Sequence, residues 1–346
     1  MTQQKDKIKQ PPYAILRGGY KYKETLGMRR VTTYCMDMVE TEKVLYVLIR
    51  TDGNGGHIRR INWKDEDLDI FGNFKWPVQM IQDSEGVLYV SDEGDNCVHT
   101  LVDDGEKGYV PIGTPANGIN LESSTAVNKI GVGKLDSPSG IAFDLEENLL
   151  VVDTGNNRVQ KFTKQGKFIE TIISDNEDNS LNMPWGIAVN HKGEIIISDW
   201  RNNRICLYDS NGNFIKSFGE IAKSLEGDML QLDGPAGLTI DDDGDIYVAD
   251  RNNNRIVVYD RDGKYVTQFT GDATLSKIGK TYIMSSPRVL RLREMSNREI
   301  WTKLRAPASV RTYKNLIYIP DFGCHRLQIY EKESYPLTKD EIFDEP

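Results

Sequence analysis

An internal repeat runs through most of the chain and limits the fold more than any other feature. Four segments superimpose without gaps, each running from a proline to an aspartate 15 residues later, at 77–92, 138–153, 184–199 and 235–250. A fifth segment, 307–321, is one residue shorter. A fixed period of this kind indicates a fold built from copies of one structural unit.

A second constant segment follows the aspartate. It reads Gly-Asn-Asn-Arg at 155–158 and Asn-Asn-Asn-Arg at 252–255, with related segments in two further units. A sixth, degenerate copy lies at the front of the chain, where Ile49 occupies the aspartate position and His57 occupies the arginine position. We therefore count six units.

Each unit reads as short strands separated by turns. In the unit that begins at residue 138, apolar or alternating runs at 141–143, 149–152, 158–162 and 167–172 are divided by clusters of turn-forming residues. This pattern is typical of strands joined by hairpins. Six units of four strands, with no room for regular helices between them, predict an all-β fold, a six-bladed β-propeller of four-stranded blades.

The ring can close only if the last blade obtains a fourth strand. Segment 20–26 resembles the fourth strand at 166–172, whereas the charged segment 331–346 does not. We predict that the N-terminal strand completes blade 6 and leaves no unpaired inner edge. The expected organisation is an N-terminal extension at 1–19, a propeller at 20–330 with insertions at about 103–135 and 270–306, and a C-terminal tail at 331–346.

The units resemble NHL repeats, a family that forms six-bladed propellers. The resemblance rests on Pro-x-Gly-Ile/Leu, then Asp-x-x-Gly, then Val-x-Asp-x-x-Asn-x-Arg-Ile/Val, and it spans residues 20–330. NHL propellers include the peptidyl-hydroxyglycine amidating lyase and many binding platforms, so the resemblance implies a fold and not one activity. In that lyase the zinc-binding histidines follow the blade-initial proline, and the matching residues here are Val78, Ser139, Trp185, Ala236 and Ala308. We therefore do not expect the amidating activity.

The aspartates and arginines that recur in the units are expected to serve the fold, because a residue present in every blade meets a need of every blade. We predict that each aspartate caps the turn between the second and third strands, and that each arginine forms an ion pair within or across blades. Residues that carry out the function are then expected at positions where a unit departs from the repeat pattern.

Charge and composition exclude several classes of protein. The formal net charge is −9, and no apolar run approaches the ~18 residues of a membrane-spanning helix. We therefore expect no nucleic acid and no membrane as a main partner. The first ten residues are polar with no apolar stretch behind them, and the four cysteines show no C-x-x-C spacing. These features predict reduced thiols and a cytoplasmic protein.

The two insertions are expected on the face of the propeller that carries the connections between blades, where ligands commonly bind. Residues 270–306 hold eight basic and three acidic residues, a net charge of +5. We predict that this segment forms a basic flap over the channel, which attracts anions through Arg288, Arg291 and Arg305. The alternative is that these arginines pair with acidic residues of the blades.

Residues that interrupt the repeat at the channel mouth are the candidate site residues. Glu93 and Arg251 follow the repeated aspartate, and Tyr34 is expected in the blade-initial proline position. These three are the catalytic candidates, because a Glu, a Tyr and an Arg could perform acid–base chemistry. The substrate-binding candidates are Gln79, Trp185, Trp200 and Phe322, together with the three flap arginines, because aromatic walls with few polar groups are typical of small-molecule sites. The aromatic side chains could equally plug the channel, and Glu93 could simply pair with Arg251.

A metal site has little support in the sequence. His57 and His325 belong to neighbouring units and are the candidate metal ligands, but two histidines without a third ligand do not define a zinc site. The acidic segment 241–245 resembles the start of a calcium loop, yet Asn252 stands where that loop needs a glutamate. His99 is expected to be structural. The cofactor stays open, with a divalent metal as one option.

Two classes of function remain. The first is an enzyme, a lyase or hydrolase that acts on a small anionic or aromatic molecule at the top of the channel. The second is a non-catalytic scaffold that binds a protein or peptide on the same face. The first is favoured because the propeller is expected to stand without a partner domain and because its long connections resemble lids. The sequence shows no phosphate-binding loop and no G-x-S-x-G nucleophile motif.

Overall fold

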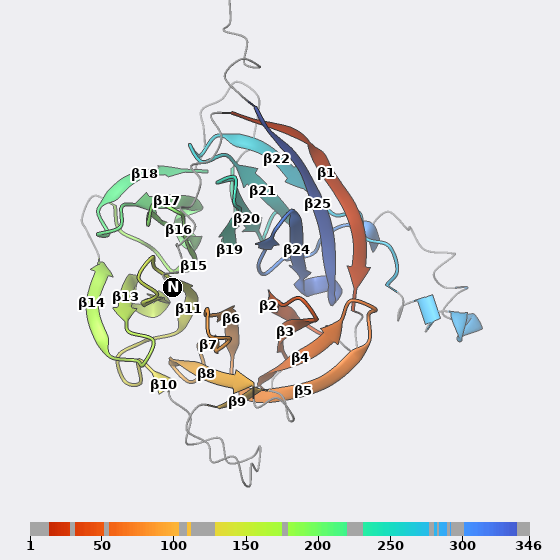
Figure 1. Ribbon diagram of the computed structural model, residues 1–346, viewed down its shortest axis with the longest axis horizontal. Helices are drawn as coiled ribbons and strands as arrows, with labels where there is room; N and C mark the ends of the chain where they lie inside the picture. The colour runs from red at the N-terminus through yellow and green to blue at the C-terminus, as the bar shows by residue number, and fades with distance from the viewer. Residues whose placement is uncertain are drawn as a thin grey trace, which may run out of the picture.

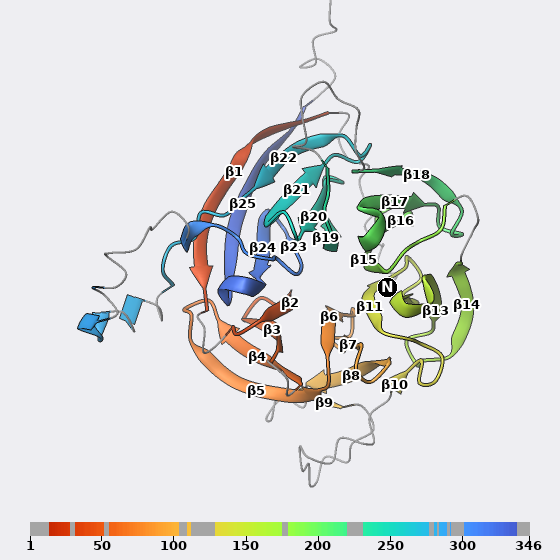
Figure 2. The ribbon, with the colours of Figure 1, turned by 180° about the vertical axis from the view of Figure 1, so that it is seen from behind.

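The computed structural model confirms the six-bladed β-propeller. Six antiparallel sheets surround a central axis, with the first strand of each blade innermost and the fourth strand at the rim (Figure 1). From behind, the same ring shows the blades following one another in chain order (Figure 2). The structure describes residues 14–27, 32–51, 55–103, 109–111, 129–174, 179–219, 231–276, 280–281, 284–288, 291 and 301–337.

Four blades follow the plain pattern, in which consecutive strands of the chain pair with one another. Blade 1 consists of β2 (Cys35–Glu40), β3 (Val44–Arg50), β4 (Gly56–Asn62) and β5 (Asp67–Phe74). Blade 3 consists of β11 (Pro138–Phe143), β12 (Leu149–Asp153), β13 (Arg158–Phe162) and β14 (Phe168–Ile173). Blade 4 consists of β15 (Pro184–Val189), β16 (Ile195–Asp199), β17 (Arg204–Tyr208) and β18 (Phe214–Phe218). Blade 5 consists of β19 (Pro235–Ile240), β20 (Ile246–Asp250), β21 (Arg255–Tyr259) and β22 (Tyr265–Phe269).

Blade 2 has a divided outer strand. Its inner strands are β6 (Pro77–Gln82), β7 (Leu88–Asp92) and β8 (Cys97–Asp103). Two short strands, β9 (Tyr109–Pro111) and β10 (Lys129–Ile130), both pair with β8. The first insertion therefore interrupts the fourth strand instead of following it, and it begins and ends at the outer rim of the blade.

Blade 6 joins the two ends of the chain, as predicted. Its order is β23 (Arg311–Tyr313), β24 (Leu316–Asp321), β25 (Arg326–Leu337) and β1 (Ala14–Leu26). The closing pair runs from Ala14 opposite Leu337 to Leu26 opposite Leu327. The predicted boundaries after residues 19 and 330 thus cut through continuous strands. The charged composition of the tail was misleading, because β25 is the third strand of the blade and its charged side chains are paired there, as buried Lys332 is with Asp241 at 2.6 Å.

Apolar side chains from the facing sheets of neighbouring blades form the core. Between blades 3 and 4, for example, Val152 and Val159 share a cluster with Ile187 and Ile197, and all four are almost completely buried. Such β-branched side chains pack well on a pleated surface. The repeat therefore encodes the same apolar contact at each junction.

The glycine of the Pro-x-Gly motif allows neighbouring first strands to approach each other closely. A Cβ atom on Gly140 would lie 2.4 Å from the Trp185 carbonyl oxygen. Blades 1 and 2 carry larger residues at this position, namely Asp37 and Gln79. Their side chains accept hydrogen bonds from backbone N–H groups of the next blade, and Gln79 Oε1 accepts from Ile141 at 2.9 Å.

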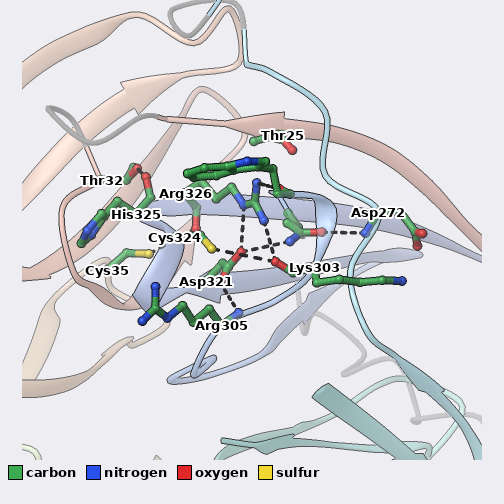
Figure 3. Close-up of polar contacts among 12 residues, drawn as sticks. Thr25, Thr32, Cys35, Asp272, Lys303, Arg305, Asp321, Cys324, His325 and Arg326 are labelled. Atoms are coloured by element: carbon green, nitrogen blue, oxygen red, sulfur yellow. Dashed lines mark hydrogen bonds and ion pairs between the residues drawn. The ribbon is translucent and has the colours of Figure 1, made fainter. Parts of the chain in front are cut away.

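The repeated arginine forms an ion pair with the repeated aspartate, as predicted, but the side chains of Asp153, Asp199 and Asp321 do not cap the turns that follow them. In blade 6, Asp321 is fully buried and accepts hydrogen bonds from Arg326 Nε at 2.8 Å and from the backbone N–H of Arg305 at 2.8 Å (Figure 3). Arg326 also donates to the carbonyl oxygen of Lys303. The buried carboxylate at the end of the second strand is therefore linked both to the start of the third strand, through Arg326, and to the segment that leads into the blade, through Arg305.

Candidate functional site

Six residues that directly follow the second strands form a set, here called the upper ring, on what we name the upper face. They are Arg50, Glu93, Thr154, Trp200, Arg251 and Phe322. The aspartate before them is nearly constant, whereas these six are of five different residue types. Sequence reasoning named Glu93, Trp200, Arg251 and Phe322 as candidates and missed Arg50. The signal was present, because Arg50 follows Ile49, which replaces the aspartate in blade 1.

Arg50 links blades 1 and 2. Its Nε donates to the carbonyl oxygen of Pro77 at 3.1 Å, and one terminal nitrogen lies 3.4 Å from Glu93 Oε2. The guanidinium also lies 4.7 Å from the centre of the Trp76 ring. Burial lowers the pKa of Arg50, and Glu93 opposes this change. The Arg50 head group is thus held between a carboxylate and an aromatic ring.

Glu93 pairs with Arg50 and not with Arg251, which had been the simple alternative. The Glu93 side chain is only 19% exposed. Burial raises the pKa of Glu93, and the positive charge of Arg50 opposes the rise. A buried carboxyl group with a raised pKa is a candidate proton acceptor or donor at neutral pH.

Arg251, in blade 5, has a different environment from Arg50 in blade 1. It donates to the carbonyl oxygen of Ala306 at 3.3 Å, and its guanidinium lies 4.6 Å from the centre of the Phe322 ring. Burial, together with charge repulsion from Arg50, lowers the pKa of Arg251 to about 10. Among the described residues, no carboxylate forms an ion pair with Arg251.

Tyr34 lies beside the upper ring, but it does not occupy the blade-initial proline position that the sequence analysis gave it. The strand register sets Cys35 opposite Ile49, so Cys35 takes the position of the blade-initial proline and Tyr34 precedes it. Tyr34 adopts φ 48°, like the residues before several blade-initial prolines. Its ring lies 5.2 Å from that of Phe322. The structure therefore brings Tyr34 to the upper ring, one residue out of the predicted register.

The two tryptophans of blade 4 stack on each other. The rings of Trp185 and Trp200 are 4.7 Å apart at an interplanar angle of 30°. Trp185 also packs against an apolar cluster that contains Met36, Val78 and Ala308 of blades 1, 2 and 6. A side chain from blade 4 that reaches these blades fills the axis, so the aromatic residues form a floor beneath the upper ring.

Other predicted substrate-binding residues lie elsewhere. Gln79 is 5% exposed and serves the junction of blades 2 and 3. Arg288 and Arg291 are exposed, and the short described pieces at 280–281, 284–288 and 291 lie outside the ring, beyond β1 (Figures 1 and 2). The side chain of Arg305 extends away from Asp321 (Figure 3). The ends of a loop do not fix its path, which is why the sequence could not place the arginines of this insertion.

The predicted metal ligands serve other purposes. His325 Nδ1 accepts a hydrogen bond from the backbone N–H of Tyr34 at 3.0 Å, and His57 lies on β4. In the acidic segment 241–245, the ammonium group of Lys332 lies within 2.9 Å of three carboxylates, where the calcium of a calcium loop would otherwise be expected. Lys332 belongs to the tail that had been separated from the propeller.

The lower face has a cavity that sequence reasoning did not anticipate. It has a volume of about 210 Å³, and its lining includes Glu40, Arg311 and Tyr318. Arg311 is engaged with Asp37, donating from Nε to Oδ1 at 2.8 Å. Burial raises the pKa of Glu40. This cavity is a second place for a small ligand, on the face opposite the upper ring.

Comparison with known families identifies the repeat. The NHL repeat model matches residues 135–162, 181–208 and 232–259, which lie in blades 3, 4 and 5. The chain is a six-bladed propeller that contains NHL repeats in blades 3, 4 and 5. The three matched units are those that carry the sequence pattern most completely, and blades 1, 2 and 6 have diverged from it.

Solved structures share the fold at low sequence identity. Virginiamycin B lyase from Staphylococcus aureus is 16% identical, with 92% of this chain and 89% of that chain covered and a TM-score of 0.52. A protein of unknown function from Bacteroides thetaiotaomicron is 14% identical, with 91% and 76% covered and a TM-score of 0.62. A chain of a nidogen/laminin complex is 17% identical, with 69% and 80% covered and a TM-score of 0.51. No curated protein matches the sequence.

The described part of the chain contains no helix with the length and hydropathy needed to cross a bilayer. All four cysteines are free thiols. Cys35 donates its thiol hydrogen to the carbonyl oxygen of Arg326 at 3.2 Å.

Proposed function

We propose that the upper face binds a small anionic molecule with an aromatic or apolar part. The observation that carries this proposal is the arrangement of Arg50 and Arg251, two partly buried guanidinium groups of which only Arg50 is paired with a carboxylate, that of Glu93. Each guanidinium lies against an aromatic ring, and the charge of Arg50 makes the charged form of Arg251 less stable. An anion bound near both would relieve this repulsion.

The rings around the arginines support the second part of the proposal. Phe322 and Tyr34 lie beside Arg251, and the stacked Trp185 and Trp200 continue the aromatic surface in blade 4. A ligand whose carboxylate is joined to an aromatic ring by a short saturated chain offers one group to the arginines and another to this floor.

We further propose that the protein is an enzyme of the lyase type. Glu93 would remove a proton from the carbon next to the anionic group of the substrate, and Arg50 and Arg251 would stabilise the negative charge that develops there. A leaving group on the adjacent carbon would then depart with its electron pair. The fold similarity to virginiamycin B lyase supports the reaction class through the fold alone. Hydrolysis at the same site is the related alternative.

The second candidate is a scaffold that binds a protein or peptide. The similarity to a propeller from a nidogen/laminin complex favours it, as does Trp76, which is 40% exposed beside Arg50. The free cysteines agree with a reducing compartment, so we place the protein in the cytoplasm. A scaffold would bind a peptide without consuming it and would not require Glu93 as a proton acceptor.

Calorimetric titration with benzoate tests the binding proposal. We expect binding to the wild-type protein and a loss of affinity of about tenfold to a hundredfold in Arg251→Gln, because a charge-assisted hydrogen bond is removed. Arg201→Gln is the matched control, since Arg201 is an exposed arginine next to Trp200, and it should bind as the wild type does. Equal affinity in all three proteins would overturn the proposal.

A further inference from the structure

Blade 2 lacks the arginine that partners the buried aspartate in blades 3 to 6. In those four blades the arginine five residues after the aspartate donates from Nε to Oδ2, at 2.7, 2.8, 2.6 and 2.8 Å. In blade 2 the same position is Cys97, and His99 follows two residues later on the same strand. The aspartate of blade 2, Asp92, is still fully buried.

Three side chains converge on one nitrogen of His99. His99 Nε2 lies 3.3 Å from Asp92 Oδ2, 3.4 Å from Asp95 Oδ2 and 3.6 Å from Cys97 Sγ. One imidazole nitrogen can form a single hydrogen bond, so it cannot satisfy three partners at once. Ligands that stand about 2.0–2.3 Å from a tetrahedral zinc ion stand roughly 3.3–3.6 Å from one another. The observed separations match these edges.

We propose that Asp95, Cys97 and His99 form a binding site for a divalent metal ion of the zinc class, with Asp92 beside His99. A thiolate, an imidazole and a carboxylate are ligand types that zinc prefers in proteins. Among the described residues, Asp95, Cys97 and His99 are the one group of at least three such residues whose ligand atoms all lie within 4.8 Å of one another. The predicted pair, His57 and His325, is not part of it.

The surroundings of the four residues fit a structural site. Cys97 and Asp92 are fully buried and His99 is 5% exposed. Cys97 and His99 point to the same face of β8, because they are two residues apart on one strand. Asp92 Oδ1 accepts from the backbone N–H groups of Trp76 at 2.8 Å and Gly94 at 2.9 Å. These bonds fix the Asp92 carboxylate in place beside His99.

Two lysines balance the charge of the cluster when no metal is bound. Lys129 Nζ lies 2.6 Å from Asp95 Oδ2, and Lys75 Nζ lies 2.5 Å from Asp95 Oδ1. The Lys75 side chain is 71% exposed and that of Lys129 31% exposed, so both can withdraw into solvent. A metal ion would displace them from the carboxylate, and the two lysines therefore compete with the metal.

Metal binding would also remove the proton from the Cys97 thiol. Burial raises the pKa of Cys97 to about 12 in the metal-free protein. The thiol proton would pass to solvent as the sulfur–metal bond forms, so affinity should increase with pH. The bound ion would fix the turn that carries Glu93 and would do so independently of any ligand on the upper face.

Titration of the metal-free full-length chain with Co²⁺ tests this site, because tetrahedral cobalt with a thiolate ligand absorbs strongly in the visible and shows a sulfur-to-metal charge-transfer band. We expect one equivalent to bind with both features, and Zn²⁺ to displace it. Cys97→Ser should lose the charge-transfer band, and His99→Gln should lose most of the affinity. Cys206→Ser is the matched control, since Cys206 is also buried on a third strand near an aspartate, and it should keep the full spectrum.

Lys129→Met gives a test that does not remove a ligand. Without the competing ammonium group, the variant should bind Co²⁺ about fivefold more tightly than the wild type. It remains informative if either ligand variant fails to fold. A wild-type protein that gives no charge-transfer band, a band that survives in Cys97→Ser, or a Lys129→Met variant with weaker binding would each overturn the proposal.

Discussion

Blades 4 and 2 share their strand order and their buried aspartate, but they surround that aspartate differently. In blade 4, Asp199 accepts from Arg204 Nε at 2.8 Å and from Asn202 at 2.8 Å, and an aromatic residue follows it. In blade 2, Asp92 faces His99, and Glu93 follows and pairs with Arg50. Blades 2 to 6 retain the carboxylate because it holds the chain segments around the turn in place. Its neighbours can change once these segments are held, and the candidate sites lie among these changed neighbours.

The largest expected effect comes from removing β1, the strand that closes the ring in blade 6. Deletion of residues 1–27 removes β1, which pairs with β25 along its whole length. The exposed edge of β25 should lead to aggregation or complete loss of the folded state. Circular dichroism and size-exclusion chromatography provide the measurement. Deletion of residues 1–13 is the control, and a 1–27 deletion that melts like the wild type would disprove the closure.

A smaller but clear effect is expected from Asp199→Ala in the regular blade. The substitution leaves Arg204, whose side chain is 14% exposed, without its buried partner. Urea denaturation should show a loss of about 3–5 kcal/mol in the free energy of unfolding. Asp92→Ala in blade 2 leaves no arginine behind and should cost about 1–3 kcal/mol through unpaired backbone N–H groups. Equal losses would remove the distinction between the two blades.

The smallest effect on stability is expected at Glu93. Burial raises the pKa of Glu93, so its ionisation in the folded protein costs stability as the pH rises through the ordinary carboxyl range. Glu93→Gln removes that cost, and at pH 7 it should be neutral or stabilise the fold by up to about 1 kcal/mol. The difference from the wild type should vanish at low pH. A loss as large as that of Asp199→Ala at pH 7 would show that Glu93 is structural.

The regular parts of the fold could be predicted from the sequence because they repeat. The proline-to-aspartate spacing, with the degenerate copy at the front of the chain, predicted six blades. The match of 20–26 to a fourth strand identified the closure. The divided outer strand of blade 2 could not be predicted, since β9 and β10 are too short to show a strand pattern. The extension of β25 was hidden by its charged side chains, such as Lys332, which is buried in ion pairs although β25 lies between β24 and β1.

The site was predicted less well, for the same physical reason. Arg50 was overlooked because Ile49 replaces the repeated aspartate in blade 1. Tyr34 was placed one residue out of register because blade 1 lacks the blade-initial proline. The convergence of His99 and Cys97 with Asp95 arises from a turn folding back on a strand, which linear spacing does not reveal. Residues that break a repeat have no second copy to align with, so their positions become clear only in three dimensions.

A crystal structure of the protein soaked with benzoate tests the central claim most directly. We predict density for the ligand on the upper face, with its carboxylate within hydrogen-bond distance of Arg50 or Arg251 and its ring against Phe322 or the tryptophans of blade 4. Density for benzoate in the lower-face cavity beside Arg311, with none near the upper ring, would contradict the assignment of function to the residues that break the repeat on the upper face.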